Sequence, residues 1–267
     1  FAVDEDPRVG MVQECLPGAN CGGCGYPGCG GLAAAIVAGK APVNSCAPGG
    51  AKAAAAIAEV MGVVAEETEP MVAFVKCGGT CDKAQNKYEY DGIDDCVMAS
   101  QLAGASSKAC AYGCMGLGSC VKACQFDAIK IENGVAVVNP DLCVACGKCV
   151  STCPKKIIDL VPKKKKVKVQ CSSKDMGKVM SVCSAGCIGC KICEKTCKFD
   201  AIHVIDNIAV IDYDKCKNCG MCANKCPKKV ITGYRVEAPK PAAPVEEAPK
   251  AEAPATEAPK AEETKAE

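Results

Sequence analysis

The spacing of the cysteines constrains this chain more than any other feature. The sequence has 26 cysteines among 267 residues, and two runs, at 143–153 and 216–226, follow the pattern C-x2-C-x2-C-x3-C-Pro. A shift of 73 residues places the eight cysteines of 110–153 on eight of the nine in 183–226, and the segments CQFDAIKIENGVAVVNPDLC and CKFDAIHVIDNIAVIDYDKC align as well. Such self-similarity predicts two copies of one module.

Each module has enough cysteines for two [4Fe–4S] clusters. A run C-x2-C-x2-C supplies three thiolates to one cluster, whereas the remote cysteine that ends the pattern ligates the neighbouring cluster. In the first module Leu117 stands where the second has Cys190, so we expect Cys110 to replace the missing ligand. The predicted sets are Cys187, Cys190, Cys193 and Cys226; Cys197, Cys216, Cys219 and Cys222; Cys110, Cys114, Cys120 and Cys153; and Cys124, Cys143, Cys146 and Cys149. Structural zinc is the alternative, but a zinc ribbon needs two separate C-x2-C pairs rather than fused triplets.

A separate set of four cysteines lies near the N-terminus. Cys21, Cys24, Cys29 and Cys46 are spaced C-x2-C-x4-C-x16-C among glycines, which let backbone amides approach inorganic sulfides. This spacing predicts a fifth cluster. A redox-active disulfide loop is the alternative, although it would need only two of the four cysteines.

Six cysteines are left over, and they allow a sixth cluster. We expect Cys15 to be a buried small hydrophobe, as free cysteine often is. The other five either contribute the ligands of a sixth cluster or are buried in the same way, and the sequence leaves both readings open. These five are Cys77, Cys81, Cys96, Cys171 and Cys183.

The predicted fold is α+β, with an N-terminal [4Fe–4S] domain followed by two tandem two-cluster modules like those of bacterial ferredoxins, and metal rather than apolar burial should stabilise it. Aromatic residues make up 4% of the chain and Trp is absent, which argues against a large conventional core. Free thiolates in such number persist only in a reducing compartment or once metallated, so we expect the cytosol of an anaerobic or low-oxygen cell. A net charge of +1 gives no indication of a nucleic-acid partner. No stretch reaches about 18 consecutive apolar residues, the length of a membrane span.

The pattern divides the chain into six segments. Each module should contain a β-hairpin, since Asn-Gly or Asp-Asn at the centre of an alternating run favours a tight turn, and short helices should follow the cysteine runs. An amphipathic helix is expected at 51–65. The predicted segments are an N-terminal single-cluster domain at 1–50, a middle cysteine region at 51–109, a first two-cluster module at 110–162, a basic linker at 163–182, a second two-cluster module at 183–236 and a disordered Pro/Ala/Glu/Lys tail at 237–267.

Residues outside the cysteine sets point to no other cofactor. His203, the only histidine, aligns with Lys130 of the other module, and we expect it to face solvent or pack rather than ligate metal. Gly-rich pieces such as GCMGLGSC lack the flanking strand and helix of a nucleotide site, so neither flavin nor nicotinamide is expected. The lysines at 163–166 form a solvated face, or else steer an acidic redox partner.

The segment VQECLPGANCGGCGYPGCGGLAAAIVAGKAPVNSCAPGG resembles the N-terminal cluster domain of the B subunit of the Rnf complex, an ion-translocating ferredoxin:NAD oxidoreductase of bacterial membranes. The resemblance covers roughly residues 8–235 and is most specific in CGGCGYPGC and NSCAPGG. It implies a relay of electrons from reduced ferredoxin to membrane-embedded and NAD-binding subunits, coupled to Na⁺ or H⁺ transport. The second module and the middle region resemble the long form of anaerobes.

The resemblance also implies a location. Members of the family usually begin with a transmembrane helix, which this sequence does not contain. We therefore expect the cytoplasmic side of the cell membrane, with the chain peripheral or anchored by a helix outside this sequence. The resemblance gives the chain an electron-transfer role in an enzyme complex, with no substrate-transforming site of its own.

Two other functions stay open at the level of sequence. The chain could wire a different anaerobic redox enzyme, such as a hydrogenase or a CO₂-reducing complex, and co-purifying partners would decide. It could instead store or assemble iron–sulfur clusters. A storage protein should release its clusters readily to apo-proteins, whereas a relay should keep them through repeated redox cycles.

Overall fold

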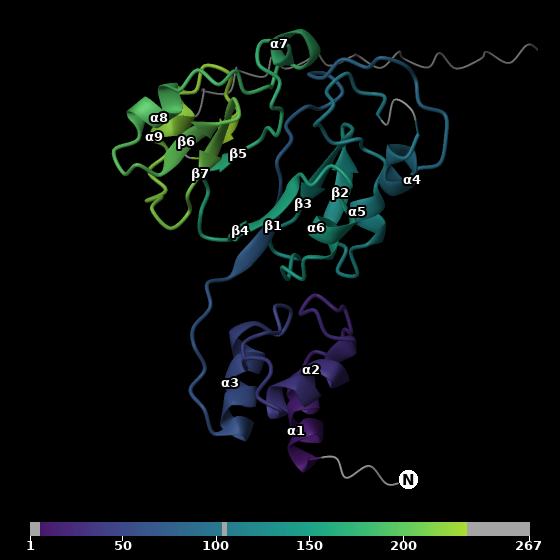
Figure 1. The fold of residues 1–267 in the computed structure, drawn as a ribbon, viewed down its shortest axis with the longest axis vertical. Coiled ribbons are helices and arrows are strands. Elements are labelled where there is room, and N and C mark those ends of the chain that lie inside the picture. The colour runs from purple at the N-terminus through teal and green to yellow at the C-terminus, as the bar shows by residue number, and fades with distance from the viewer. Residues whose placement is uncertain (1–5, 103–105, 234–267) are drawn as a thin grey trace, which may run out of the picture. The chain divides into compact units, whose positions relative to one another are not determined.

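The computed structural model describes residues 6–102 and 106–233 (Figure 1). In these residues short helices alternate with four two-stranded antiparallel sheets. This mixed content agrees with the predicted α+β class. The tail predicted at 237–267 lies outside the described residues.

Three helices form the N-terminal part of the chain. They are α1 (Pro7–Cys15), α2 (Gly28–Val37) and α3 (Gly50–Met61). Helix α1 packs against both of the others. The largest fully buried side chains of this helical core are Val12, Leu32, Ile36 and Ile57. Helix α3 confirms the helix predicted at 51–65 but ends earlier, because Gly62 takes a left-handed φ of 66° and closes the last turn.

Each module contains the predicted β-hairpin. The strands are β2 (Ile129–Glu132) with β3 (Val135–Val138), and β6 (Ile202–Ile205) with β7 (Ile208–Ile211). Both central residues of each turn have positive φ, Asn133 and Gly134 in the first and Asp206 and Asn207 in the second. Such turns match the right-handed twist of the flanking strands, which explains why the sequence signal was correct.

A second sheet extends each module, because it pairs a strand outside the predicted bounds, 110–162 or 183–236, with a strand after the module's last cysteine. Strand β1 (Met71–Val75) pairs with β4 (Ile158–Pro162), and β5 (Lys168–Val169) pairs with β8 (Ile231–Thr232). Just past these strands the Lys76 N–H donates to Ile157 O at 2.7 Å, and the Gln170 N–H donates to Val230 O at 2.9 Å. Ile157 and Val230 are related by the 73-residue shift. Lys76 and Gln170 are therefore structurally equivalent, although that shift does not align them.

The remaining helices are one to two turns long. They are α4 (Cys96–Ser100), α5 (Ser119–Lys122), α6 (Lys148–Thr152), α7 (Val179–Val182), α8 (Ile192–Thr196) and α9 (Met221–Lys225). Helices α5, α6, α8 and α9 begin one residue before the third cysteine of a run. These helices were predicted to follow the runs, but they begin inside them. A residue of positive φ, such as Gly147 or Gly220, directly precedes the first helical residue.

Candidate metal centres

Four cavities of the described residues are each lined by four cysteines. No disulfide joins any of the cysteines. A [4Fe–4S] cluster takes one thiolate per iron, so the donor sets fit this cofactor. Nowhere in the described residues do three Cys, His, Asp or Glu side chains group tightly enough to hold a single metal ion. The cavities are lined by Cys77, Cys110, Cys171 and Cys183; by Cys96, Cys114, Cys120 and Cys153; by Cys197, Cys216, Cys219 and Cys222; and by Cys187, Cys190, Cys193 and Cys226.

In the second module the structure brings together the two sets that the sequence predicts. Cys197 reaches the cavity of the later run, and Cys226 reaches the cavity of the earlier one. Burial raises the pKa of both Cys193 and Cys222 to about 11, and the neighbouring thiolates of each set add to the rise. Because metal binds the thiolate, loading either site must displace protons from these buried thiols.

Two further predicted sets also come together. Burial raises the pKa of Cys149 to about 11, and the thiolates of Cys143, Cys146 and Cys124 raise it further. Burial likewise raises the pKa of Cys46, opposed by a hydrogen bond from the Gly49 N–H. The thiolates of Cys29, Cys21 and Cys24 act on Cys46 as well. Each of these cysteines thus lies within electrostatic reach of the three predicted partners of its set.

The first set of the first module differs from the sequence prediction. Cys96, not Cys110, lies with Cys114, Cys120 and Cys153 around the cavity. Burial raises the pKa of Cys120 to about 12, and among the thiolates that raise it further is Cys96. The absence of a cysteine at Leu117 did signal a substitute ligand. Proximity in sequence suggested Cys110, whereas folding of the middle region supplies Cys96.

Two contacts fix the position of Cys96. It is the first residue of α4, and the Asp95 carboxylate caps this helix by accepting the N–H groups of Val97 and Met98 at 2.8 and 2.9 Å. The Cys96 N–H donates to the buried hydroxyl oxygen of Ser119 at 2.5 Å. Since Ser119 precedes Cys120, this hydrogen bond joins the middle region to the run of the first module.

Loss of the Ser119 hydroxyl should loosen this set. In Ser119→Ala the Cys96 N–H is left buried without its acceptor, which we expect to destabilise the fold by about 1–3 kcal/mol. The measurements are the urea midpoint of the metallated chain and the rate at which a chelator removes iron. Ser151→Ala is the matched control, because Ser151 is exposed and its hydroxyl only donates to Lys148 O. Equal rates of iron loss in the two variants would contradict the role of Ser119.

The remaining cavity lies between the two modules and is built symmetrically. Cys77 follows β1 and Cys171 follows β5, each two residues past its strand. The Cys114 N–H donates to the Cys77 sulfur at 3.4 Å, and the Cys187 N–H donates to the Cys171 sulfur at 3.3 Å. Cys114 and Cys187 are related by the 73-residue shift, as are Cys110 and Cys183. Each module therefore supplies two equivalent cysteines to one site, which we call the interior site.

Backbone contacts close the interior site from both sides. The Gly78 N–H donates to Gln170 O at 2.9 Å, and the Ser172 hydroxyl donates to Lys76 O at 2.8 Å. The segment around Gln85 joins the two other cysteine loops. The Gln85 N–H donates to Val182 O at 2.9 Å, and Gln85 O accepts the Ala109 N–H at 2.7 Å. The modules are thus hydrogen-bonded to each other around the four sulfurs.

Two leftover cysteines stay outside the cavities described above. Cys81, a candidate for the sixth cluster, is exposed and lines none of them, so that part of the prediction is not supported. Cys15 packs against the core of the N-terminal helices, as a small hydrophobic residue would.

Amide groups also point at ligand sulfurs in the modules. The Ala201 N–H donates to the Cys197 sulfur at 3.4 Å, and the Asn218 N–H donates to the Cys216 sulfur at the same distance. In the first module the Ala73 N–H of β1 donates to the Cys143 sulfur, again at 3.4 Å. Hydrogen bonds of this kind favour negative charge on the sulfur.

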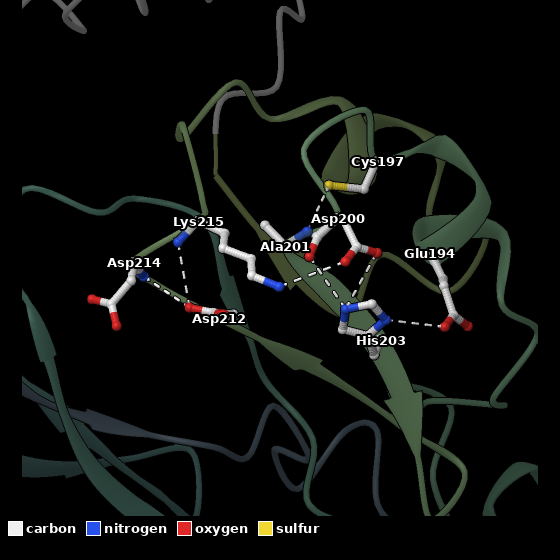
Figure 2. A network of polar contacts seen from close by, with 8 residues as sticks. All are labelled: Glu194, Cys197, Asp200, Ala201, His203, Asp212, Asp214 and Lys215. Carbon is white, nitrogen blue, oxygen red and sulfur yellow. Dashed lines mark hydrogen bonds and ion pairs between the residues drawn. The ribbon is translucent and has the colours of Figure 1, made fainter.

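His203 lies in a polar network on the outside of the second hairpin (Figure 2). Its Nδ1 lies 3.3 Å from Glu194 Oε1, and its Nε2 lies 3.2 Å from Asp200 O. Asp200 also faces Lys215 Nζ at 3.6 Å. The imidazole, 38% exposed, lies between acidic groups and lines none of the four-cysteine cavities.

Comparison with known families bears on all three cysteine-rich parts. Residues 16–48 match the family described as "Putative Fe-S cluster", residues 136–159 match a 4Fe-4S binding domain, and residues 186–230 match a 4Fe-4S dicluster domain. Iron–sulfur families therefore cover the N-terminal set and parts of both modules.

Three relatives align over most of their length. The B subunit of the Na⁺-translocating ferredoxin:NAD⁺ oxidoreductase complex of Acetobacterium woodii is 51% identical, over 87% of this chain and 70% of the relative. The B subunit of the ion-translocating oxidoreductase complex of Methanosarcina acetivorans is 46% identical, over 86% and 88%. The proton-translocating counterpart of Clostridium ljungdahlii is 45% identical, over 87% and 85%. The chain belongs to this family of B subunits. The resemblance seen in CGGCGYPGC and NSCAPGG is thereby confirmed.

The cysteines of this member of the B-subunit family lie between Cys15 and Cys226. Within residues 6–102 and 106–233, none of the helices has the length and apolar character needed to cross a membrane. The candidate sites of the chain are thus the six cysteine sets, four of them around cavities and two recognised from the charges acting on Cys46 and Cys149.

Proposed function

We propose that this chain holds six [4Fe–4S] clusters and relays single electrons through them. Five sets involve the N-terminal motif and the two modules, and the sixth is the interior site of Cys77, Cys110, Cys171 and Cys183. The observation that carries the proposal is that four cavities are each lined by four cysteines, the number of ligands that one [4Fe–4S] cluster takes.

The relay is the function that such sites support. A [4Fe–4S] cluster bound by four thiolates accepts and releases one electron at a potential set by hydrogen bonds to sulfur and by solvent access. The thiolates of this chain hold the iron, and amides such as those of Ala201 and Asn218 donate to ligand sulfurs. Ile202 and Ile231, both buried, pack around the sites of the second module and exclude water.

The interior site makes the relay continuous between the modules. Apart from this site the two modules contact each other through hydrogen bonds such as Gly78 N–H to Gln170 O and Ser172 hydroxyl to Lys76 O. The four cysteines of the interior site come from both modules, so a cluster bound there can accept and donate electrons at the junction between them. This supports a relay over a storage protein, because a storage site has no need of a ligand set shared at a junction.

The family supplies the partners of the relay. Relatives are named as subunits of ion-translocating ferredoxin:NAD⁺ oxidoreductase complexes. We assign this chain the same role: it takes electrons from reduced ferredoxin on the cytoplasmic side of the membrane and passes them to membrane-embedded and NAD-binding subunits. The chain is thus the electron-transfer subunit of a translocating oxidoreductase.

Iron and acid-labile sulfide per anaerobically purified chain, together with EPR of the dithionite-reduced protein, test this proposal. Six clusters require about 24 irons with coupled [4Fe–4S] signals. A count of about 20 irons would mean that only five of the six sets hold a cluster. Zinc in place of iron, with no signal on reduction, would refute the electron-carrier function altogether.

A further inference from the structure

Lys108 is a buried cation beside the interior site. The residue is 3% exposed, and its Nζ donates to Gly79 O at 2.8 Å and to Gly134 O at 2.6 Å. Among the described residues, no carboxylate lies within ion-pairing distance of this ammonium group. A buried charge normally has a partner of opposite sign, because water no longer solvates it.

The interior cavity offers Lys108 a partner of negative charge. Lys108 lines the cavity together with its four cysteines. Gly79, which accepts a hydrogen bond from Lys108, lies against the sulfurs, since a Cβ on this residue would be 3.3 Å from Cys183 Sγ and 3.7 Å from Cys77 Sγ. Burial raises the pKa of the Cys183 thiol, and the charge of Lys108 works against that rise, as it does for Cys114 of the adjoining first-module set. The ammonium group is therefore close enough to favour negative charge on this site.

The lysine breaks the symmetry of the site. The 73-residue shift places Lys108 on Ser181, which is exposed and whose hydroxyl donates only to Lys178 O. The second module folds the same hairpin and the same cysteine loop without a buried cation at this position. The scaffold itself therefore does not require the lysine.

We propose that the charge of Lys108 raises the reduction potential of the interior site. The inference rests on the proposed six-cluster relay. Four thiolates around an iron–sulfur cube carry net negative charge, and an added electron makes that charge larger. A fixed positive charge in a medium of low dielectric constant stabilises the reduced form. The interior site then attracts and holds electrons at the junction between the modules.

The test is an EPR-monitored redox titration of the full metallated chain. Cys171→Ala identifies the signal of the interior site as the component that disappears. In Lys108→Gln, which keeps an N–H donor for the two carbonyls but removes the charge, that component should become about tenfold harder to reduce, a shift of about 59 mV to more negative potential. Lys108→Arg should keep the original potential, and so should Lys87→Gln, a control at an exposed lysine of the adjoining segment.

The outcomes distinguish a failure of the role given to Lys108 from a failure of the six-cluster proposal. A Lys108→Gln chain with a full complement of iron and an unshifted interior component overturns the role of Lys108 and leaves the relay intact. If the Lys108→Gln chain does not retain the interior cluster, the same titration is made on Lys108→Met, and an unshifted interior component again overturns the role of Lys108. A wild-type chain with about 20 irons, from which Cys171→Ala removes none, overturns the interior site itself.

Discussion

Removal of iron from the full chain should unfold both cysteine modules while the N-terminal helices keep part of their structure. The strands of the modules are two to five residues long and pair only in twos, and their helices have four or five residues. Elements this short are not stable alone in water. The cysteines themselves make up much of the buried surface around the hairpins, so the clusters act as the core.

Hydrogen exchange with mass spectrometry gives the residue-level measurement. After iron is removed anaerobically, the amides of β2, β3, β6 and β7 should lose their protection, since metal binding and folding are coupled in small metal-dependent domains. The internal control is the N-terminal region, where α1, α2 and α3 have 9 to 12 residues and an apolar core of their own. Retained protection at Ile129 and Ile202 in the iron-free chain would show that apolar packing alone holds the modules.

The two cysteine sets predicted for the second module each line one cavity, whereas in the first module Cys96 stands where Cys110 was expected. In the second module every ligand of a set lies inside the repeat, so spacing alone determines which cysteines meet. The hairpin turns at Asn133 and Asp206 were likewise local, because two residues with positive φ are enough to specify them. Local signals of this kind depend on neither tertiary structure nor alignment.

The interior site could not be predicted in the same way. Cys77 and Cys171 are equivalent in the structure, but the middle region separates Cys77 from its module by a longer segment, so no single shift aligns them. The evidence for their equivalence is tertiary, namely the strand pairing of β1 with β4 and of β5 with β8. Lys108 is similar, since its burial follows from carbonyls at Gly79 and Gly134 that are distant in sequence.

Double substitutions should reveal which cysteines share a cluster, because removing two ligands of one cluster loses no more iron than removing one. Each of Cys96→Ala, Cys110→Ala and Cys171→Ala should lower the iron content by about four. The pair Cys110 and Cys171 should still lose about four, since both line the interior cavity. Cys81→Ala is the control and should lose none, because Cys81 is exposed and outside the cavities described here.

The decisive pairs combine Cys120 with each of the two candidate partners. The structure places Cys96 beside Cys120, so that double variant should lose about four irons, whereas Cys110 with Cys120 should lose about eight. The assignment drawn from sequence spacing puts Cys110 and Cys120 in one cluster and therefore predicts a loss of about four irons for that pair. Iron counts alone can mislead if one loss destabilises a neighbouring site, so the EPR components that disappear should be compared as well. If Cys110 and Cys120 remove the same component, Cys110 ligates the first-module cluster and the interior set of four is incomplete.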